Sequence, residues 1–289
     1  MATFTALTTV PDAKCAEALG EALESLVPAP TGVGVFRLED DSGLWEIGGY
    51  FQDRPDEISL AILAGAFDAK PFAVSRVDDR DWVAQVRREL HPVEAGRFTV
   101  YGSHDSHRVG PNRIGLRIEA AMAFGTGHHG TTRGCLMLFD RLLRQRHRPR
   151  RVADIGCGTG VLAMAAAKAL RVPCVATDID QVAAETARAN IAANGASPWV
   201  RTGRAAGFRH AHLRASAPFD LVFANILASP LKRLAPSIAE HLALGGHAIL
   251  AGLLTYQATG VIRTFEGHGF VRSDFIRLGD WTSLTMRRL

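Results

Sequence analysis

The stretch Val152-Ala153-Asp154-Ile155-Gly156-Cys157-Gly158-Thr159-Gly160 decides the fold of this 289-residue chain. Its first residues are mainly apolar and predict a buried strand, after which glycine stands at every second position and a helical stretch begins. Glycine lets the backbone turn tightly and approach a ligand without a Cβ atom in the way. The start of the helix also offers N–H groups without intrahelical partners. The segment therefore predicts a ligand-binding turn at the carboxyl end of a strand.

A carboxylate ends the next expected strand, because Asp178 follows Val175-Ala176-Thr177 and lies 22 residues after Gly156. In nucleotide-binding α/β sheets an acid at this place hydrogen-bonds ribose hydroxyls. The dinucleotide fingerprint G-x-G-x-x-G/A does not fit, since its last position falls on Val161. The spacing therefore predicts a nucleoside site and argues against a dinucleotide enzyme.

Strands and helices alternate outward from this segment to near the end of the chain. Short apolar strands between helices indicate a parallel sheet covered on both faces. The last two strands form an antiparallel hairpin through Gly279-Asp280. We expect a Rossmann-like, doubly wound α/β fold with a mostly parallel seven-stranded sheet and an antiparallel C-terminal strand. The expected strands are 151–155, 174–178, 199–202, 221–224, 247–250, 270–278 and 283–288, and the expected helices are 160–170, 181–194 and 231–242.

The first part of the chain has a different pattern. Short strands at 35–38, 44–50 and 72–77 alternate with helices at 11–26 and 55–67, which suits a small α+β domain of the ferredoxin-like type. An acidic start and a basic end predict a helix over 78–90, and Pro92 stops it. A strand at 97–101 then opens the rest of the chain. We expect an N-terminal substrate-recognition domain at 1–77, a linker helix at 78–90 and a catalytic domain at 91–289.

Composition excludes several classes of protein. With 47% hydrophobic and 21% charged residues, the chain is neither disordered nor collagenous nor a coiled coil. No apolar run reaches the 18 or so residues of a membrane span, and the first ten residues lack a basic n-region. The four cysteines are dispersed. We expect a reduced, cytoplasmic protein without a disulfide framework.

Charge and histidine content leave two questions. The net charge is +4 and 29 of the 33 basic residues are arginine. A positive field suits an acidic or nucleoprotein partner, but an arginine-biased composition is the favoured explanation. The eleven histidines include the pairs His104/His107 and His128/His129, but no Cys or carboxylate motif completes a ligand set. We expect no metal site.

Two further segments flank the glycine loop. Ala123-Phe124-Gly125-Thr126-Gly127-His128-His129-Gly130-Thr131-Thr132 precedes it and opens a helix at 133–143, as a lid over a small ligand would. Phe223-Ala224-Asn225-Ile226-Leu227-Ala228 follows the fourth strand. The side chain of Asn225 is expected at the carboxyl edge of the sheet, where reacting groups meet.

The motif D-x-G-x-G-x-G resembles the first motif of class I S-adenosylmethionine-dependent methyltransferases. Together with F-G-T-G-H-H-x-T-T, D-I-D and N-I-L-A it resembles the PrmA family, the methyltransferases of ribosomal protein L-11. The resemblance implies a cofactor, S-adenosyl-L-methionine, with Asp154 near the cationic amine of its methionine part. Four residues of the turn, Phe124, Gly125, Thr126 and Gly127, would cover the cofactor. The implied contacts come from Thr132, Gly156, Asp178 and Asn225, together with the loop glycines Gly158 and Gly160.

The chain departs from the family pattern at two places. Gly130 stands where members often have a proline or an acidic residue, so we expect a looser lid. The third strand ends in Thr202-Gly203-Arg204, without the acid that many methyltransferases place near the adenine. No adenine partner is therefore predicted.

The resemblance implies methylation of lysine side-chain and N-terminal amines of ribosomal protein L-11, free or ribosome-bound. We expect Asn225 to position the substrate nitrogen, the cofactor or both, in a monomer that makes no sequence-specific contact with nucleic acid. Asn225-Ile226-Leu227-Ala228 differs from the Asn/Asp-Pro-Pro-aromatic motif of base-methylating enzymes. The alternatives are a methyltransferase acting on another protein or a small amine, and a non-catalytic, cofactor-binding assembly factor.

Overall fold

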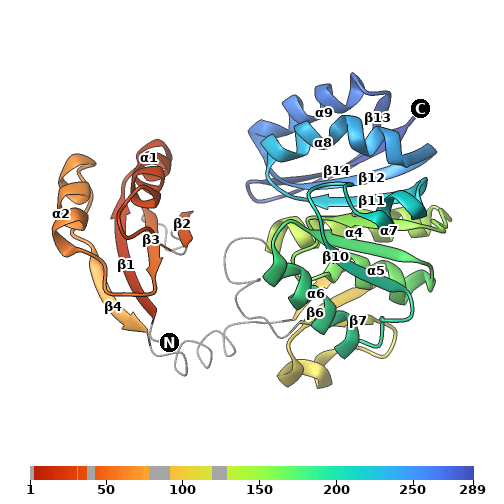
Figure 1. The fold of residues 1–289 in the computed structure, drawn as a ribbon, viewed down its shortest axis with the longest axis horizontal. Helices are drawn as coiled ribbons and strands as arrows, with labels where there is room; N and C mark the ends of the chain where they lie inside the picture. The colour runs from red at the N-terminus through yellow and green to blue at the C-terminus, as the bar shows by residue number, and fades with distance from the viewer. Residues whose placement is uncertain (1–2, 31, 38–42, 78–91, 119–128) are drawn as a thin grey trace. The chain divides into compact units, whose positions relative to one another are not determined.

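The computed structural model describes residues 3–30, 32–37, 43–77, 92–118 and 129–289 (Figure 1). The chain divides into two compact units, Met1–Glu89 and Leu90–Leu289, and each has its own hydrophobic core. The predicted linker helix at 78–90 lies outside the described residues.

The N-terminal unit is a four-stranded antiparallel sheet with two helices. Its sheet order is β2-β3-β1-β4, so the two βαβ halves interlock as in a ferredoxin-like fold. Each helix has an aspartate N-cap: Asp12 accepts from the N–H of Cys15 at 2.9 Å, and Asp56 accepts from Ile58 and Ser59. The elements are β1 (Thr3–Val10), α1 (Ala13–Glu24), β2 (Gly32–Arg37), β3 (Trp45–Phe51), α2 (Glu57–Ala66) and β4 (Ala73–Val77).

Strand β1 was not predicted, although it lies between two partners in this sheet. Its apolar pattern is interrupted by threonines, two of which are buried. Thr5 shares a hydrogen bond of 2.7 Å with the hydroxyl of Ser75, and Thr8 donates to the carbonyl of Lys70. Tertiary partners thus allow polar side chains in a position where periodicity alone predicts apolar ones.

The second unit is built on a seven-stranded sheet of order β10-β9-β8-β11-β12-β14-β13. The first five strands in this order are parallel, and β14 pairs antiparallel with both β12 and β13. The predicted fold class is confirmed, including the antiparallel last strand. The strands are β8 (Val152–Ile155), β9 (Cys174–Asp178), β10 (Val200–Arg204), β11 (Phe219–Asn225), β12 (Leu242–Leu254), β13 (Phe270–Leu278) and β14 (Trp281–Arg288).

Helices cover both faces of this sheet. Side chains alternate between two cores along β11, with Phe223 in one core and Val222 and Ala224 in the other. The first core contains residues of α4 (His129–Arg144), α5 (Val161–Leu170) and α6 (Gln181–Ala193). The second contains residues of α7 (Ala211–Ser216), α8 (Ala228–His241) and α9 (Ala258–Glu266), of which α8 and α9 are seen together in Figure 1.

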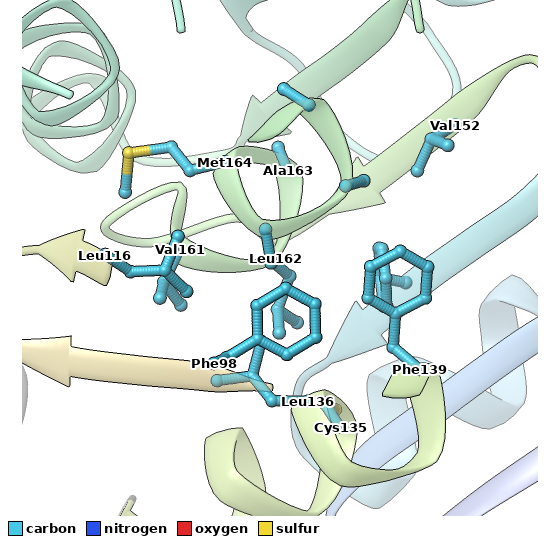
Figure 2. Close-up of a cluster of buried hydrophobic side chains, with 14 of the residues drawn as sticks. Phe98, Leu116, Cys135, Leu136, Phe139, Val152, Val161, Leu162, Ala163 and Met164 are labelled. Carbon is cyan, nitrogen blue, oxygen red and sulfur yellow. The ribbon is translucent and has the colours of Figure 1, made fainter. Parts of the chain in front are cut away.

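A three-stranded sheet precedes α4 and packs against the first core. It comprises β5 (Val93–Ala95), β6 (Phe98–Tyr101) and β7 (Ile114–Arg117), with a 3-10 helix, η1 (Ser103–Arg108), between the last two strands. Figure 2 shows Phe98 of β6 among side chains of α4 and α5. Its ring stacks on Phe139 at 5.6 Å between centroids, and Phe139 meets Phe223 edge-on at 5.4 Å. This aromatic row fixes α4 on the sheet.

The structure differs from the predicted elements at several places. Helices α7 and α9 were not predicted, nor were β5 and β7. Helix α8 begins at Ala228, three residues before its predicted start, and β12 runs from Leu242 to Leu254 although only 247–250 was predicted. Prolines lie at 230 and 236 of α8, and glycines interrupt β12, so local propensity underestimates both elements.

Candidate functional site

The glycine loop connects β8 to α5 at the carboxyl edge of the sheet. All three glycines have left-handed backbone angles, with φ of 71° at Gly156, 52° at Gly158 and 76° at Gly160. The N–H groups of Gly156 and Cys157 both donate to the carbonyl of Thr177, at 2.8 and 3.0 Å. The turn is therefore tied to β9, and glycine is required because other residues rarely adopt these angles.

The three glycines face different surroundings. A Cβ atom on Gly156 would overlap the Cγ2 atom of Ile226, and one on Gly160 would lie 3.1 Å from Ala187 in α6. A Cβ atom on Gly158 would meet no described heavy atom within 4 Å. Gly156 and Gly160 thus serve close packing, whereas Gly158 presents bare backbone to open space, which is what a ligand needs to approach the loop.

Asp178 lies beside this open space, at the end of β9. Its Oδ2 atom accepts a hydrogen bond from the N–H of Gly158 at 2.9 Å, and Oδ1 accepts from the N–H of Asp180 at 3.0 Å. The residue is only half-buried, so its carboxylate keeps lone pairs for further donors. Asp180 caps α6 by accepting from the N–H of Val182 at 3.0 Å. Asp178 is thus placed to bind hydroxyl groups, whereas Asp180 stabilises the start of α6.

Asp154 lies beneath the loop on β8 and is 1% exposed. Its Oδ2 atom accepts from the N–H of Ala163 in α5 at 3.0 Å, while Oδ1 has no hydrogen-bond partner among the described residues. Burial, opposed in part by the Ala163 hydrogen bond and assisted by the charge of Asp178, raises the pKa of Asp154 to about 7. A buried carboxyl oxygen without a partner suits a cationic or hydrogen-bonding group near the loop.

Asn225 and Thr132 meet across the same edge. Asn225 ends β11, and its Nδ2 atom donates to the hydroxyl oxygen of Thr132 in α4 at 3.3 Å. Thr132 is 8% exposed, whereas Asn225 is half-buried. With the amide nitrogen turned to Thr132, the Oδ1 atom of Asn225 is left to accept from a donor such as an amine.

The structure brings most of the predicted site residues together, from five segments: α4, β8, the glycine loop, β9 and β11. The predicted lid, Phe124–Gly127, lies outside the described residues. Two residues that sequence reasoning missed, Ile226 and Gly252, join these segments by packing. The isolated glycine in the apolar run Ala251-Gly252-Leu253-Leu254 is a signal that could have indicated the second of them.

The other groups considered were the Cys157 thiol and possible metal ligands. Burial raises the pKa of the Cys157 thiol, as do the charges of Asp154 and Asp178, so this thiol is a poor nucleophile. Within the described ranges, no group of three or more His, Cys, Asp or Glu side chains is placed to hold a metal ion. No helix in the same ranges is long and apolar enough to cross a bilayer.

Sheet order, glycine loop and acids together define a class. A parallel sheet with its last strand antiparallel, a glycine loop after β8 and an acid after β9 are the features of a class I S-adenosylmethionine-dependent methyltransferase. The residues present fit this cofactor. Open backbone at Gly158 and the carboxylate of Asp178 suit a nucleoside, and the unpartnered oxygen of Asp154 suits a cationic amine.

Comparison with known proteins identifies the family. The family model described as "Ribosomal protein L11 methyltransferase (PrmA)" matches residues 35–289, and the chain belongs to this family. A relative named ribosomal protein L11 methyltransferase, from Bradyrhizobium diazoefficiens, is 47% identical over 259 residues, with 88% of each chain covered. One of the same name from Rhodopseudomonas palustris is 45% identical over 269 residues, covering 92% of this chain and 90% of the relative.

A solved structure agrees with this assignment. The crystal structure of a ribosomal protein L11 methylase from Lactobacillus delbrueckii subsp. bulgaricus is 25% identical and superposes with a TM-score of 0.57. The match covers 69% of this chain and 99% of the solved one. The resemblance inferred from the motifs is thereby confirmed.

Proposed function

We propose that this chain transfers methyl groups from S-adenosylmethionine to lysine side-chain and N-terminal amines of ribosomal protein L11. Family membership over residues 35–289 supports L11 as the substrate. The observation that supports the chemistry is the hydrogen bond from the Nδ2 atom of Asn225 to Thr132, since it leaves the Oδ1 atom of Asn225 to accept a hydrogen bond from an amine.

The cofactor supplies a sulfonium-bound methyl group that needs little activation. The chain's own task is to bring a neutral amine into line with that group. A lysine amine with a pKa of about 10.4 costs roughly 4.6 kcal/mol to deprotonate at pH 7. Burial at the carboxyl edge disfavours the ammonium form, and so does a neighbouring positive charge. The Oδ1 atom of Asn225 accepts a hydrogen bond from the amine and orients its lone pair.

The other predicted residues hold the cofactor in this proposal. Asp178 would accept hydrogen bonds from the ribose hydroxyls while keeping its bond to Gly158, and Gly156, Gly158 and Gly160 shape the loop. Asp154 would hold the cationic amine through its unpartnered oxygen. Thr132 contributes by fixing the amide of Asn225. The segment Phe124–Gly127, which lies outside the described residues, is proposed to cover the cofactor.

The remaining proposals concern substrate recognition, domain organisation, cellular location and oligomeric state. The N-terminal domain at 1–77 binds L11, the linker helix at 78–90 joins it to the methyltransferase domain at 91–289, and the enzyme acts as a cytoplasmic monomer. L11 is accepted free or on the ribosome. A methyltransferase that acts on another protein or a small amine uses the same site with a different recognition surface.

Mass spectrometry of L11 incubated with cofactor and enzyme tests the proposal. We expect added methyl groups on lysine and N-terminal amines with the wild type. Asn225→Ala is expected to lower kcat about 100-fold, the scale of one well-placed polar group in an active site. Calorimetry with S-adenosylhomocysteine on the same variant separates lost binding from lost transfer.

Radioactive methyl transfer into a cell lysate distinguishes the alternatives. Label in one small ribosomal protein supports L11, and label in other proteins or in RNA assigns a different substrate. An absence of label, with cofactor binding intact, would identify a non-catalytic assembly factor. Wild-type transfer by Asn225→Ala would remove Asn225 from the mechanism.

A further inference from the structure

Ile226 packs between the glycine loop and strand β12 at the carboxyl edge of the sheet. On one side a Cβ atom at Gly156 would overlap the Cγ2 atom of Ile226. On the other side a Cβ atom at Gly252 would overlap the carbonyl oxygen of Ile226 and lie 2.7 Å from its carbonyl carbon. One residue therefore touches the glycine loop with its side chain and β12 with its backbone.

The contact at Gly252 depends on a bulge in β12. Leu250 pairs with Leu284 of β14 and Leu253 pairs with Thr282, so two residues of β12 stand opposite Ser283 alone. Gly252 occupies this bulge with a φ of 80°. The N–H of Ile226 also donates to the carbonyl of Ala251 at 3.2 Å. The bulge thus brings the backbone of β12 against the turn that follows Asn225.

The glycine loop on the other side of Ile226 is equally constrained. Gly156 has a φ of 71° and its N–H is bonded to Thr177. Backbone hydrogen bonds therefore hold Gly156 on one side of Ile226 and Ala251, next to Gly252, on the other. Asn225 pairs with Ala251 of β12 and directly precedes Ile226, so the packing of Ile226 acts on the end of β11 that carries Asn225.

We propose that Ile226 is a positioning residue for methyl transfer: held between Gly156 and Gly252, it sets the distance between Asn225 and the glycine loop. The inference rests on the proposed role of Asn225. Methyl transfer is sensitive to alignment, and a misplacement of about 1 Å can lower a rate 100-fold. Ile226 itself acts through Asn225.

Truncating the side chain of Ile226 is the first test. Ile226→Ala removes the Cγ2 atom that meets Gly156, and kcat is expected to fall about tenfold, with KM for L11 within about twofold of the wild type. Ile226→Val keeps both γ carbons and is expected to restore kcat to within about twofold. Equal kcat for wild type and Ile226→Ala would overturn the proposal.

Two glycines of the same strand give a matched pair. Gly252→Ala adds a Cβ atom against the backbone of Ile226 and is expected to lower kcat at least about tenfold. Gly245, also in β12, has a φ of 76° but no described heavy atom within 4 Å of its Cβ position. Gly245→Ala therefore carries the same backbone strain without the contact, and kcat is expected to stay within about twofold. A similar loss in both variants would count against the proposal.

A double-mutant cycle separates positioning from general destabilisation. If Ile226 acts through Asn225, Ile226→Ala lowers the residual kcat of Asn225→Ala by less than about twofold. A further tenfold loss in that background would overturn the proposal. This cycle uses Ile226→Ala, so it stays decisive if Gly252→Ala does not fold.

An NMR measurement without cofactor or L11 gives an independent readout. The side-chain amide signals of Asn225, identified by their loss in Asn225→Ala, are expected to shift in Ile226→Ala and to stay in place in Gly245→Ala. Unchanged signals in Ile226→Ala would contradict the positioning role. Absence of L11 methylation by the wild type would instead refute the proposed function and leave this result standing.

Discussion

The polar groups at the two edges of the seven-stranded sheet differ in whether they have partners within the protein. At the amino edge, the N–H groups of Arg150 and Arg151 both donate to Oδ2 of Asp220, at 2.7 and 3.0 Å. The ring of His147 packs on that of His247 with 4.6 Å between centroids. At the carboxyl edge, Gly158 faces open space, and an oxygen of Asp154 lacks a partner among the described residues. The groups at the amino edge thus interact with one another, whereas the carboxyl edge keeps groups available for a ligand.

A buried titratable group at each edge makes this difference measurable. Burial raises the pKa of Asp154 to about 7. Burial, together with the nearby charges of His147 and Arg287, lowers the pKa of His247 to about 4. Both groups are therefore uncharged in the folded protein over part of the acid range, but their effects on stability have opposite signs.

The largest expected effect is on the pH dependence of the free energy of unfolding, and it comes from Asp154. Between about pH 4 and 7 the folded state keeps a proton that the unfolded state, with an ordinary pKa of about 3.9, has lost. The contribution of this group to the free energy of unfolding therefore falls as pH rises, by about 4 kcal/mol in total. Asp154→Asn removes this dependence. Denaturant unfolding at pH 5 and pH 8 measures it, and the same pH slope in both proteins would contradict the assignment.

His247 is expected to act in the opposite direction by about 3 kcal/mol. Its folded pKa lies below the ordinary value, so between about pH 6.5 and 4 only the unfolded state binds the proton, and stability falls as the pH is lowered. His247→Gln should remove this pH dependence of the free energy of unfolding and leave cofactor affinity unchanged. A loss of affinity would mean that the two edges are not independent.

Asp178 and Asp180 test the carboxyl edge with two acids only two residues apart. Asp178→Ala is expected to weaken binding of S-adenosylhomocysteine about 100-fold, because it removes a charged acceptor for loop and ligand. Asp180→Ala removes only a helix cap and should lower the free energy of unfolding by about 1 kcal/mol. Calorimetry and denaturant unfolding of both variants measure the contrast. Equal affinities in the two variants would place the ribose acid elsewhere.

Local pattern was enough to predict much of this protein. The run from Val152 to Gly160 predicted strand, turn and helix, because burial and left-handed backbone angles demand particular residues at each position. The alternation of elements then predicted the parallel sheet. Strand β1 escaped prediction because Thr5 and Thr8 are satisfied by partners some 60 to 70 residues away. The β12 bulge escaped because its register depends on β14.

The amino-acid sequence by itself determined the class of fold and the glycine loop, and it suggested Asp154, Asp178 and Asn225 for the proposed site, since these follow from spacing and side-chain chemistry. Only the tertiary structure decided which loop glycine faces open space, which way the amide of Asn225 turns, and that Ile226 joins the glycine loop to β12. Those features depend on contacts between segments far apart in the chain, and such contacts produce no local periodicity in the sequence.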